Sequence, residues 1–118
     1  MPHLHTVLVA DDEPDLREMM VATFAEAGYA VLAAADGFDA VRVLADNWVN
    51  LLITDVRMPG ISGFELSRQA KVMRPQISVI YLSGYPQDKI ENGLVNGPVI
   101  MKPFRMCDLI AEVRHLLS

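Results

Sequence analysis

Short apolar runs alternate with longer amphipathic segments along most of the chain. A short apolar run bounded by turn-forming residues is typical of a strand buried on both faces. Five such runs occur, at residues 6–10, 29–34, 51–54, 77–82 and 99–101. The segments that follow them repeat apolar residues every three or four positions, as one face of a helix does. The pattern therefore predicts five strand–helix units in succession.

Several of the predicted helices have recognisable ends. Pro14 suits the first turn of a helix, where its missing N–H costs nothing, and Gly28 is a natural stop after residues 14–27. Ser62 is placed to cap the helix that follows the third strand. Residues 87–97 form the least regular segment, because their apolar set is short and includes glycines. We expect the fourth helix, in that segment, to be short or distorted.

This alternation predicts an α/β fold of the (βα)5 type, with a doubly wound parallel five-stranded sheet. Parallel strands joined through helices need right-handed crossovers, which place helices on both faces of the sheet. Pro98, at the start of the last predicted strand, lacks an N–H and therefore favours an edge position. The length of 118 residues suits one domain, residues 1–118.

Composition adds limits on the kind of protein. Hydrophobic residues make up 52% of the chain, so a packed core is expected. The net charge of −5 argues against direct nucleic-acid binding, which needs a basic surface. The single cysteine, Cys107, excludes an internal disulfide framework and fits a reducing compartment. Since no apolar run approaches a membrane span and the N-terminus does not resemble a signal peptide, we expect a cytoplasmic protein without membrane attachment.

Polar side chains follow four of the five predicted strands. Asp11 and Asp12 follow the first strand, Asp55 the third, Ser83 the fourth and Lys102 the fifth. The carboxyl ends of parallel strands share one edge of a sheet, so these groups should converge there. Three converging carboxylates repel one another unless a hard cation such as Mg²⁺ binds between them. A carboxylate beside such a cation can attack phosphorus, while the lysine and the hydroxyl stabilise the transferred phosphoryl group.

Each of these residues also has an ordinary interpretation. The acidic pair could be a turn with a helix cap, Asp55 and Ser83 could be turn residues, and Lys102 could be a surface lysine. Their joint placement at the correct strand ends favours the site over coincidence. Outside the site, we expect Met19, Met20, Met58 and Met73 to fill the core. We expect Trp48, in the loop before the third strand, to be a packing anchor rather than a stacking platform.

The order and spacing of these residues resemble those of the receiver domain of two-component response regulators, over the whole chain. The matching motifs are Asp11-Asp12, Thr54-Asp55-Val56-Arg57-Met58-Pro59-Gly60, Ser83-Gly84 and Lys102-Pro103-Phe104. The resemblance implies a flavodoxin-like receiver fold with strand order 2-1-3-4-5. It also implies a cis peptide bond before Pro103.

The same resemblance assigns roles at the site. It implies that Asp55 is the phosphoacceptor. It implies a Mg²⁺ cofactor, or Mn²⁺ in its place, held by Asp12, Asp55 and the backbone carbonyl of Arg57. Asp11 would act on the metal largely through water.

Further roles follow from the resemblance for residues around the acceptor. Ser83 would be the switch hydroxyl, and Lys102 the lysine that contacts the phosphoryl group. Arg57 and Tyr85 occupy positions that tune the lifetime of the phosphoryl group in the family, and both are large enough to hinder an attacking water.

The expected signalling face includes Val99, Pro103 and Phe104, and here the chain departs from the family pattern. Many receivers carry Tyr or Phe three residues before the lysine, where this chain has Val99. The segment between Ser83 and Lys102 is also a few residues shorter than is common in the family. We therefore expect standard chemistry and an unusual output surface.

The function implied is a phosphoacceptor receiver in a two-component phosphorelay. It would take a phosphoryl group from a phosphohistidine of a sensor histidine kinase or phosphotransfer protein. It would then signal to a downstream target protein through the surface of the fourth helix, fifth strand and last helix. A dimer that forms on phosphorylation is a further partner that the sequence allows. We expect no enzyme activity beyond its own phosphoryl transfer and slow autodephosphorylation.

Three alternatives remain beside this function. One is an aspartyl-phosphate phosphatase, which is disfavoured because such enzymes commonly need a second aspartate where this chain has Arg57, a residue that cannot donate a proton at neutral pH. Another is a degenerate receiver that serves only as a binding scaffold. The third is a receiver excised from a hybrid histidine kinase or a longer regulator. Met1 favours a natural start, while Ser118 leaves the other end open.

Overall fold

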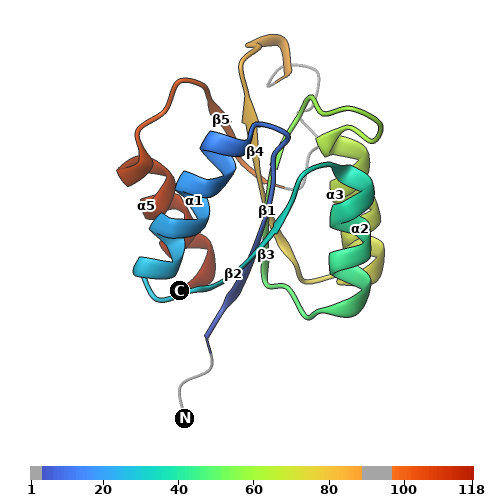
Figure 1. Ribbon diagram of the computed structural model, residues 1–118, viewed down its shortest axis with the longest axis horizontal. Coiled ribbons are helices and arrows are strands. Elements are labelled where there is room, and N and C mark those ends of the chain that lie inside the picture. Colours follow the sequence, from blue (N-terminus) through green and yellow to red (C-terminus); the bar gives the residue numbers. More distant parts are fainter. Residues whose placement is uncertain (1–3, 89–96) are drawn as a thin grey trace.

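Five parallel strands form the centre of the molecule, with helices on both sides (Figure 1). The computed structural model describes residues 4–88 and 97–118. The described strands and helices are β1 (Thr6–Ala10), α1 (Pro14–Glu26), β2 (Ala30–Ala34), α2 (Gly37–Asp46), β3 (Leu51–Asp55), α3 (Gly63–Met73), β4 (Ser78–Ser83), β5 (Val99–Met101) and α5 (Met106–Leu117).

The strand order is β2-β1-β3-β4-β5, which confirms the predicted topology. All four neighbouring pairs are parallel. The edge position predicted for the last strand is correct, and Pro98 lies just before it, with its carbonyl accepting the N–H of Tyr81 at 2.9 Å. The register places the carboxyl ends of the strands at one edge, since Asp55 pairs with Leu82 and Ser83 pairs with Met101.

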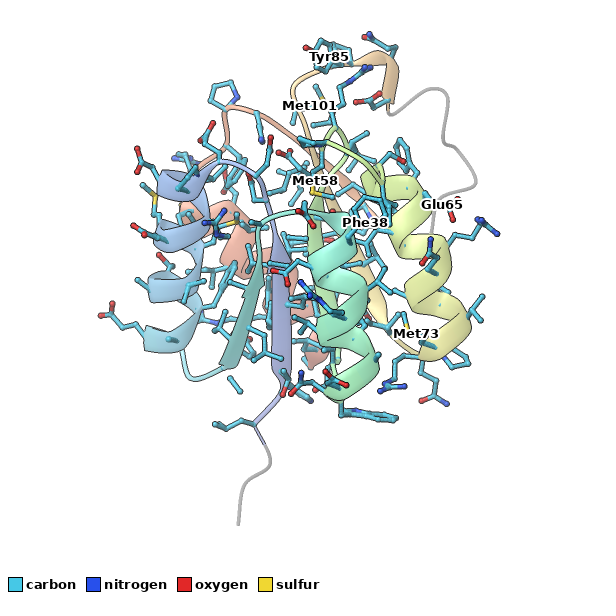
Figure 2. All side chains as sticks on the ribbon, turned by 45° about the vertical axis from the view of Figure 1, so that its right-hand side comes forward. Phe38, Met58, Glu65, Met73, Tyr85 and Met101 are labelled. Carbon is cyan, nitrogen blue, oxygen red and sulfur yellow. The ribbon has the colours of Figure 1, made fainter. Side chains whose placement is uncertain are left out.

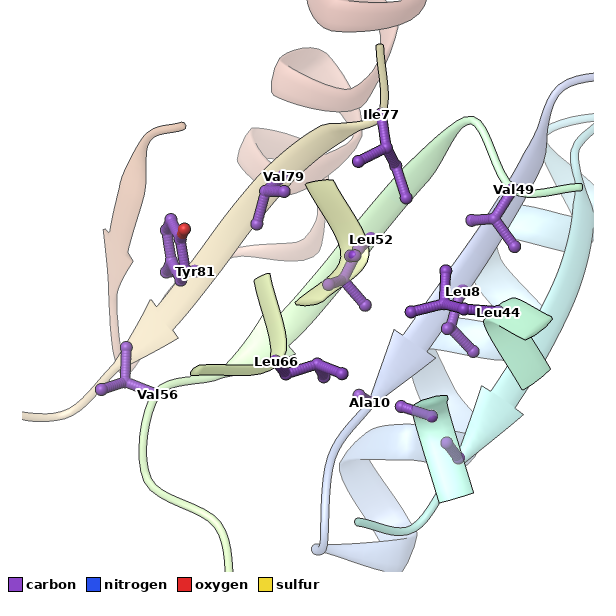
Figure 3. Packing of buried hydrophobic residues seen from close by; sticks show 13 residues of the cluster. Leu8, Ala10, Leu44, Val49, Leu52, Val56, Leu66, Ile77, Val79 and Tyr81 are labelled. Carbon is purple, nitrogen blue, oxygen red and sulfur yellow. The ribbon is translucent and has the colours of Figure 1, made fainter. Parts of the chain in front are cut away.

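The sheet has a hydrophobic core on each face. Along β1, Val7 and Val9 pack toward α1 and α5, while Leu8 and Ala10 pack toward α2 and α3. This alternation follows from the two-residue period of a strand, and it explains why a strand buried on both faces is a continuous apolar run. Figure 3 shows the side that α2 and α3 cover. Burial of each large aliphatic side chain there contributes about 1.5–3 kcal/mol.

The helix ends agree with the sequence signals. Pro14 is the first residue of α1, and Gly28 follows that helix with φ +102°, a conformation that favours glycine. The hydroxyl of Ser62 caps α3 by accepting the N–H of Glu65 at 3.2 Å. Strand β4 runs one residue later than predicted, from Ser78 to Ser83.

Two packing expectations are wrong. Trp48 is 70% exposed and is not a packing anchor, because its indole stacks on the guanidinium of Arg74, with 5.2 Å between the ring centre and Cζ. Met19 is 56% exposed, because the buried stripe of α1 passes through Met20 and Phe24, four residues apart. The identity of these residues as tryptophan and methionine did not indicate whether their side chains would be buried or exposed.

The predicted short fourth helix falls mainly on residues 89–96, which lie outside the described residues. Within the described ranges, no helix combines the length and apolar character that a membrane crossing requires. The peptide bond between Lys102 and Pro103 is cis, as the resemblance implied.

Candidate functional site

Three carboxylates meet at the carboxyl edge of the sheet. Asp11 directly follows β1, Asp12 comes next, and Asp55 is the last residue of β3. One oxygen from each lies within 4.8 Å of the others. Asp11 is fully buried, Asp55 is 7% exposed and Asp12 is exposed. Neighbouring strands β1 and β3 are paired from Val7 with Leu51 to Ala10 with Thr54, so the acids that follow arrive side by side.

The two carboxylate oxygens of Asp11 differ in their hydrogen bonding. Its Oδ1 accepts the backbone N–H of Glu13 at 2.8 Å. Its Oδ2 is buried and has no hydrogen-bond partner within the part of the chain that the structure describes. Arg17 donates to the backbone carbonyl of Asp11 at 2.8 Å and helps hold the loop. A buried carboxylate oxygen without a donor fits a site that binds a hard cation.

Asp55 is held rigidly by the backbone around it. The N–H of Val56 donates to the carbonyl of Leu82 at 2.9 Å, and the N–H of Gly63 donates to the carbonyl of Val56 at 2.8 Å. A Cβ on Gly63 would lie 2.1 Å from the Asp55 carbonyl oxygen, so only glycine allows α3 to begin this close to the acid. The acceptor carboxylate therefore starts from a fixed backbone position.

Lys102 pairs directly with Asp55. Its Nζ lies 2.8 Å from Asp55 Oδ1, and its backbone N–H donates to the Ser83 carbonyl at 2.7 Å. A cavity of about 290 Å³ opens beside this pair. It is lined by Asp55, Arg57, Leu82, Ser83, Gly84, Tyr85 and Lys102. The structure thus brings the predicted acceptor, lysine and hydroxyl together around one space.

Burial changes the proton affinity of these groups. It raises the pKa of Asp55 to about 6; the Lys102 hydrogen bond opposes this shift, while the charges of Asp11 and Asp12 add to it. Burial also raises the pKa of Asp11, against the effect of the Glu13 N–H. For Lys102, burial alone would lower the pKa, but the hydrogen bond and charge of Asp55 outweigh it and the pKa rises. The carboxylates are therefore ionised at a cost that a bound cation would relieve.

The hydroxyl of Ser83 is not directed at Asp55. It donates to Asp88 Oδ2 at 2.5 Å and accepts the backbone N–H of Tyr85 at 3.0 Å. The other oxygen of Asp88, Oδ1, lies 3.2 Å from Nη2 of Arg57, whose guanidinium sits 4.0 Å from the centre of the Tyr85 ring. The two residues expected to tune phosphoryl lifetime, Arg57 and Tyr85, are thus in contact with each other.

Asp88 is the site residue that the sequence analysis missed. It is 2% exposed, although it lies in the segment whose pattern was least regular. No periodic signal predicts such burial, because it depends on Arg57, 31 positions earlier in the chain. An acidic residue five positions after a strand-end serine was the available hint, and it is a weak one.

The three residues expected on the signalling face are not brought together. Val99 packs with the core on the α2–α3 side, while Phe104 packs with the core on the α1–α5 side, and Pro103 is exposed. Val99 pairs in register with Tyr81, which is fully buried and donates to Ser67 Oγ at 2.6 Å. Tyr81 of β4 is therefore the aromatic residue paired with Val99, and its ring is part of the core.

Known proteins give a consistent comparison. The chain matches the family model of the response regulator receiver domain over residues 7–114. It is 30% identical to the response regulator receiver protein CpdR of Brucella abortus (strain 2308), covering 94% of this chain and 95% of that protein. It spans about half the length of other curated relatives, such as the transcriptional regulatory protein AruR of Pseudomonas aeruginosa.

Solved structures agree with the family match. The receiver domain of the hybrid histidine kinase CckA is 30% identical with a TM-score of 0.84, covering 96% of this chain and 99% of that one. The response regulator TrrA of Thermotoga maritima, solved in complex with Mg²⁺-BeF, is 28% identical with a TM-score of 0.87 over 96% of this chain and 99% of that one.

Proposed function

Because this chain belongs to the response regulator receiver domains of two-component systems, we propose that it accepts a phosphoryl group on Asp55. One observation carries the proposal. The buried carboxylate of Asp55 faces a cavity with the Lys102 ammonium at 2.8 Å and the carboxylates of Asp11 and Asp12 within 4.8 Å. These four side chains stand at the carboxyl ends of three different strands, so their convergence is a property of the fold.

The acidic residues support Mg²⁺, or Mn²⁺, as the cofactor. Asp12, Asp55 and the backbone carbonyl of Arg57 would be direct ligands, with Asp11 acting mainly through water. The buried Oδ2 of Asp11, which has no hydrogen-bond partner among the described residues, fits this arrangement, and the TrrA neighbour was solved with Mg²⁺-BeF. Bound metal would supply positive charge to the carboxylates and to the phosphoryl oxygens.

In the proposed transfer, an Asp55 carboxylate oxygen attacks the phosphorus of a phosphohistidine on a kinase or phosphotransfer protein. The new O–P bond forms as the P–N bond breaks, and the electron pair of that bond goes to the imidazole nitrogen. Asp55 must be ionised to attack, and its pKa of about 6 leaves it mostly ionised at neutral pH. Lys102 would pass from the carboxylate to a phosphoryl oxygen, and Ser83 would donate to another.

Output would be a change in protein contacts. We expect the surface of the fourth helix, β5 and α5, including Val99, Pro103 and Phe104, to bind a target protein differently after phosphorylation. The chain would act in the cytoplasm, without direct nucleic-acid binding, and would not turn over a substrate beyond its own phosphorylation and slow dephosphorylation. The similarity to the receiver of CckA supports a histidine kinase as phosphodonor, or a place within one.

Incubation with Mg²⁺ and a small phosphodonor tests the proposal. We expect intact-mass spectrometry to show the addition of one phosphoryl group to the wild type, and none after Asp55→Asn or in EDTA. Asp108→Asn is a matched control, because this exposed acid lies on α5 and pairs with Arg105 at the surface. Equal labelling of wild type and Asp55→Asn would contradict the assignment. Steady release of phosphate from a small phosphoester would favour the phosphatase instead.

A further inference from the structure

Asp88 is a buried acid that has no role in the phosphoryl transfer described above. It lies five residues after the end of β4 and donates its backbone N–H to the carbonyl of Tyr85, a residue that lines the cavity and that Figure 2 labels. A buried carboxylate must be bonded to donors, because its desolvation is costly otherwise. Asp88 takes its donors from Ser83 and Arg57, and both of these residues line the cavity with Asp55.

The hydrogen bond from Ser83 to Asp88 uses the proton that Ser83 would donate to a phosphoryl group. A serine hydroxyl carries one proton and can donate to one strong acceptor at a time. The Tyr85 carbonyl oxygen lies 3.1 Å from the hydroxyl, but Asp88 Oδ2, at 2.5 Å, is the nearer acceptor and makes a charge-assisted hydrogen bond in a buried place. For Ser83 to donate to a phosphoryl oxygen on Asp55, the bond to Asp88 must break.

The backbone holds Asp88 in this position. Its N–H donates to the carbonyl of Tyr85 at 3.0 Å, and the N–H of Tyr85 donates to Ser83 Oγ at 3.0 Å. The turn from Ser83 to Asp88 thus closes on itself around the hydroxyl. Arg57 covers the turn, with its guanidinium over the Tyr85 ring and bonded to Asp88 Oδ1. Asp88 thus engages both donors, each of which lines the cavity beside the acceptor carboxylate.

We propose that Asp88 is a positioning residue that competes with phosphorylated Asp55 for the Ser83 hydroxyl and the Arg57 guanidinium. This inference rests on the proposed function. Phosphorylation places about two negative charges at the cavity, and transfer of the two donors to them breaks both of these contacts with Asp88. Asp88 therefore lowers the affinity of the site for a phosphoryl group. It also links phosphorylation to the turn that follows β4.

The test uses beryllofluoride, a phosphoryl analogue, at saturating Mg²⁺ with the whole chain. Its apparent Kd is measured by ¹⁹F NMR or calorimetry for wild type, Asp88→Asn and Asp88→Ala. Loss of a charge-assisted hydrogen bond that competes with the ligand should tighten binding about tenfold in both variants. Asp108→Asn, which removes an exposed acid paired with Arg105, should bind as the wild type does. Thermal melts of each variant verify that it folds.

A double-mutant cycle with Ser83→Ala separates competition from a general change in charge. Without the hydroxyl, Asp88→Asn should tighten binding by a factor of about two or less, because the Arg57 side chain is 53% exposed and solvent weakens its pairing with Asp88. In the wild type, the amide resonance of Tyr85 should shift on saturation with beryllofluoride, since its hydrogen-bond acceptor moves. This shift needs no Asp88 variant and should be small in Ser83→Ala.

The outcomes distinguish the two proposals. Failure of the wild type to bind beryllofluoride would count against the proposed function itself. Binding by the wild type with equal or weaker affinity in both Asp88 variants would overturn the competition and leave the proposed function in place. The competition would also be overturned if Asp88→Asn tightened binding as much in the Ser83→Ala background as in the wild type. An unchanged Tyr85 amide resonance at saturation with beryllofluoride would overturn it too.

Discussion

Replacing Asp55 by asparagine is expected to stabilise the metal-free chain at neutral and alkaline pH. The folded carboxyl has a pKa of about 6 against an ordinary value of 3.8, mainly because it is buried. The folded state therefore binds the proton more tightly than the unfolded chain does, so stability falls as pH rises from the unfolded to the folded pKa. Two pKa units correspond to about 3 kcal/mol, which Asp55→Asn would restore above this range.

The assay is urea unfolding in EDTA, compared at about pH 4 and about pH 8, below and above most of the titration. At the higher pH, the free energy of unfolding of the variant should exceed that of the wild type by up to about 3 kcal/mol, less the contribution of the lost bond to Lys102. At the lower pH the difference should be small. Asp108→Asn should change stability by about 0.5 kcal/mol or less at either pH, as surface substitutions do. A destabilised Asp55→Asn at high pH, or a gain independent of pH, would refute the argument from burial.

Other consequences can be measured on the same protein. Lys102→Ala should weaken beryllofluoride binding at least about tenfold, because it removes the ammonium that lies 2.8 Å from Asp55; an unchanged Kd would contradict this role. Gly63→Ala should cost about 3 kcal/mol in urea unfolding, since its Cβ would meet the Asp55 carbonyl at 2.1 Å, whereas Gly84→Ala meets nothing and should be near neutral. Tyr81→Phe should cost about 1–2 kcal/mol by losing its buried hydroxyl bond to α3, and an equally stable variant would argue against that bond.

The convergence of Asp11, Asp55 and Lys102 was predictable from the sequence because it depends on local signals. An apolar run in the sequence predicts each strand, and each acid or lysine directly follows its run. Parallel pairing then places all strand ends at one edge, whatever the details of packing. Ser83 was placed correctly for the same reason.

Features that depend on contacts between distant loops were not predictable in this way. Asp88 is buried in the turn after β4, where it contacts Ser83, five positions earlier, and Arg57, 31 positions earlier, and neither contact leaves a period in the sequence. Trp48 was misinterpreted as a packing anchor because its partner is the guanidinium of Arg74, which directly follows α3. The orientation of the Ser83 hydroxyl likewise follows from a partner that the sequence did not single out.

The most direct test of the central claim identifies the phosphorylated residue. After incubation with Mg²⁺ and a small phosphodonor, borohydride reduction converts an aspartyl phosphate to homoserine, which tandem mass spectrometry can locate. The account predicts homoserine at position 55 alone, and no conversion in Asp55→Asn. Conversion at another acid, or none in a chain that binds Mg²⁺, would contradict it.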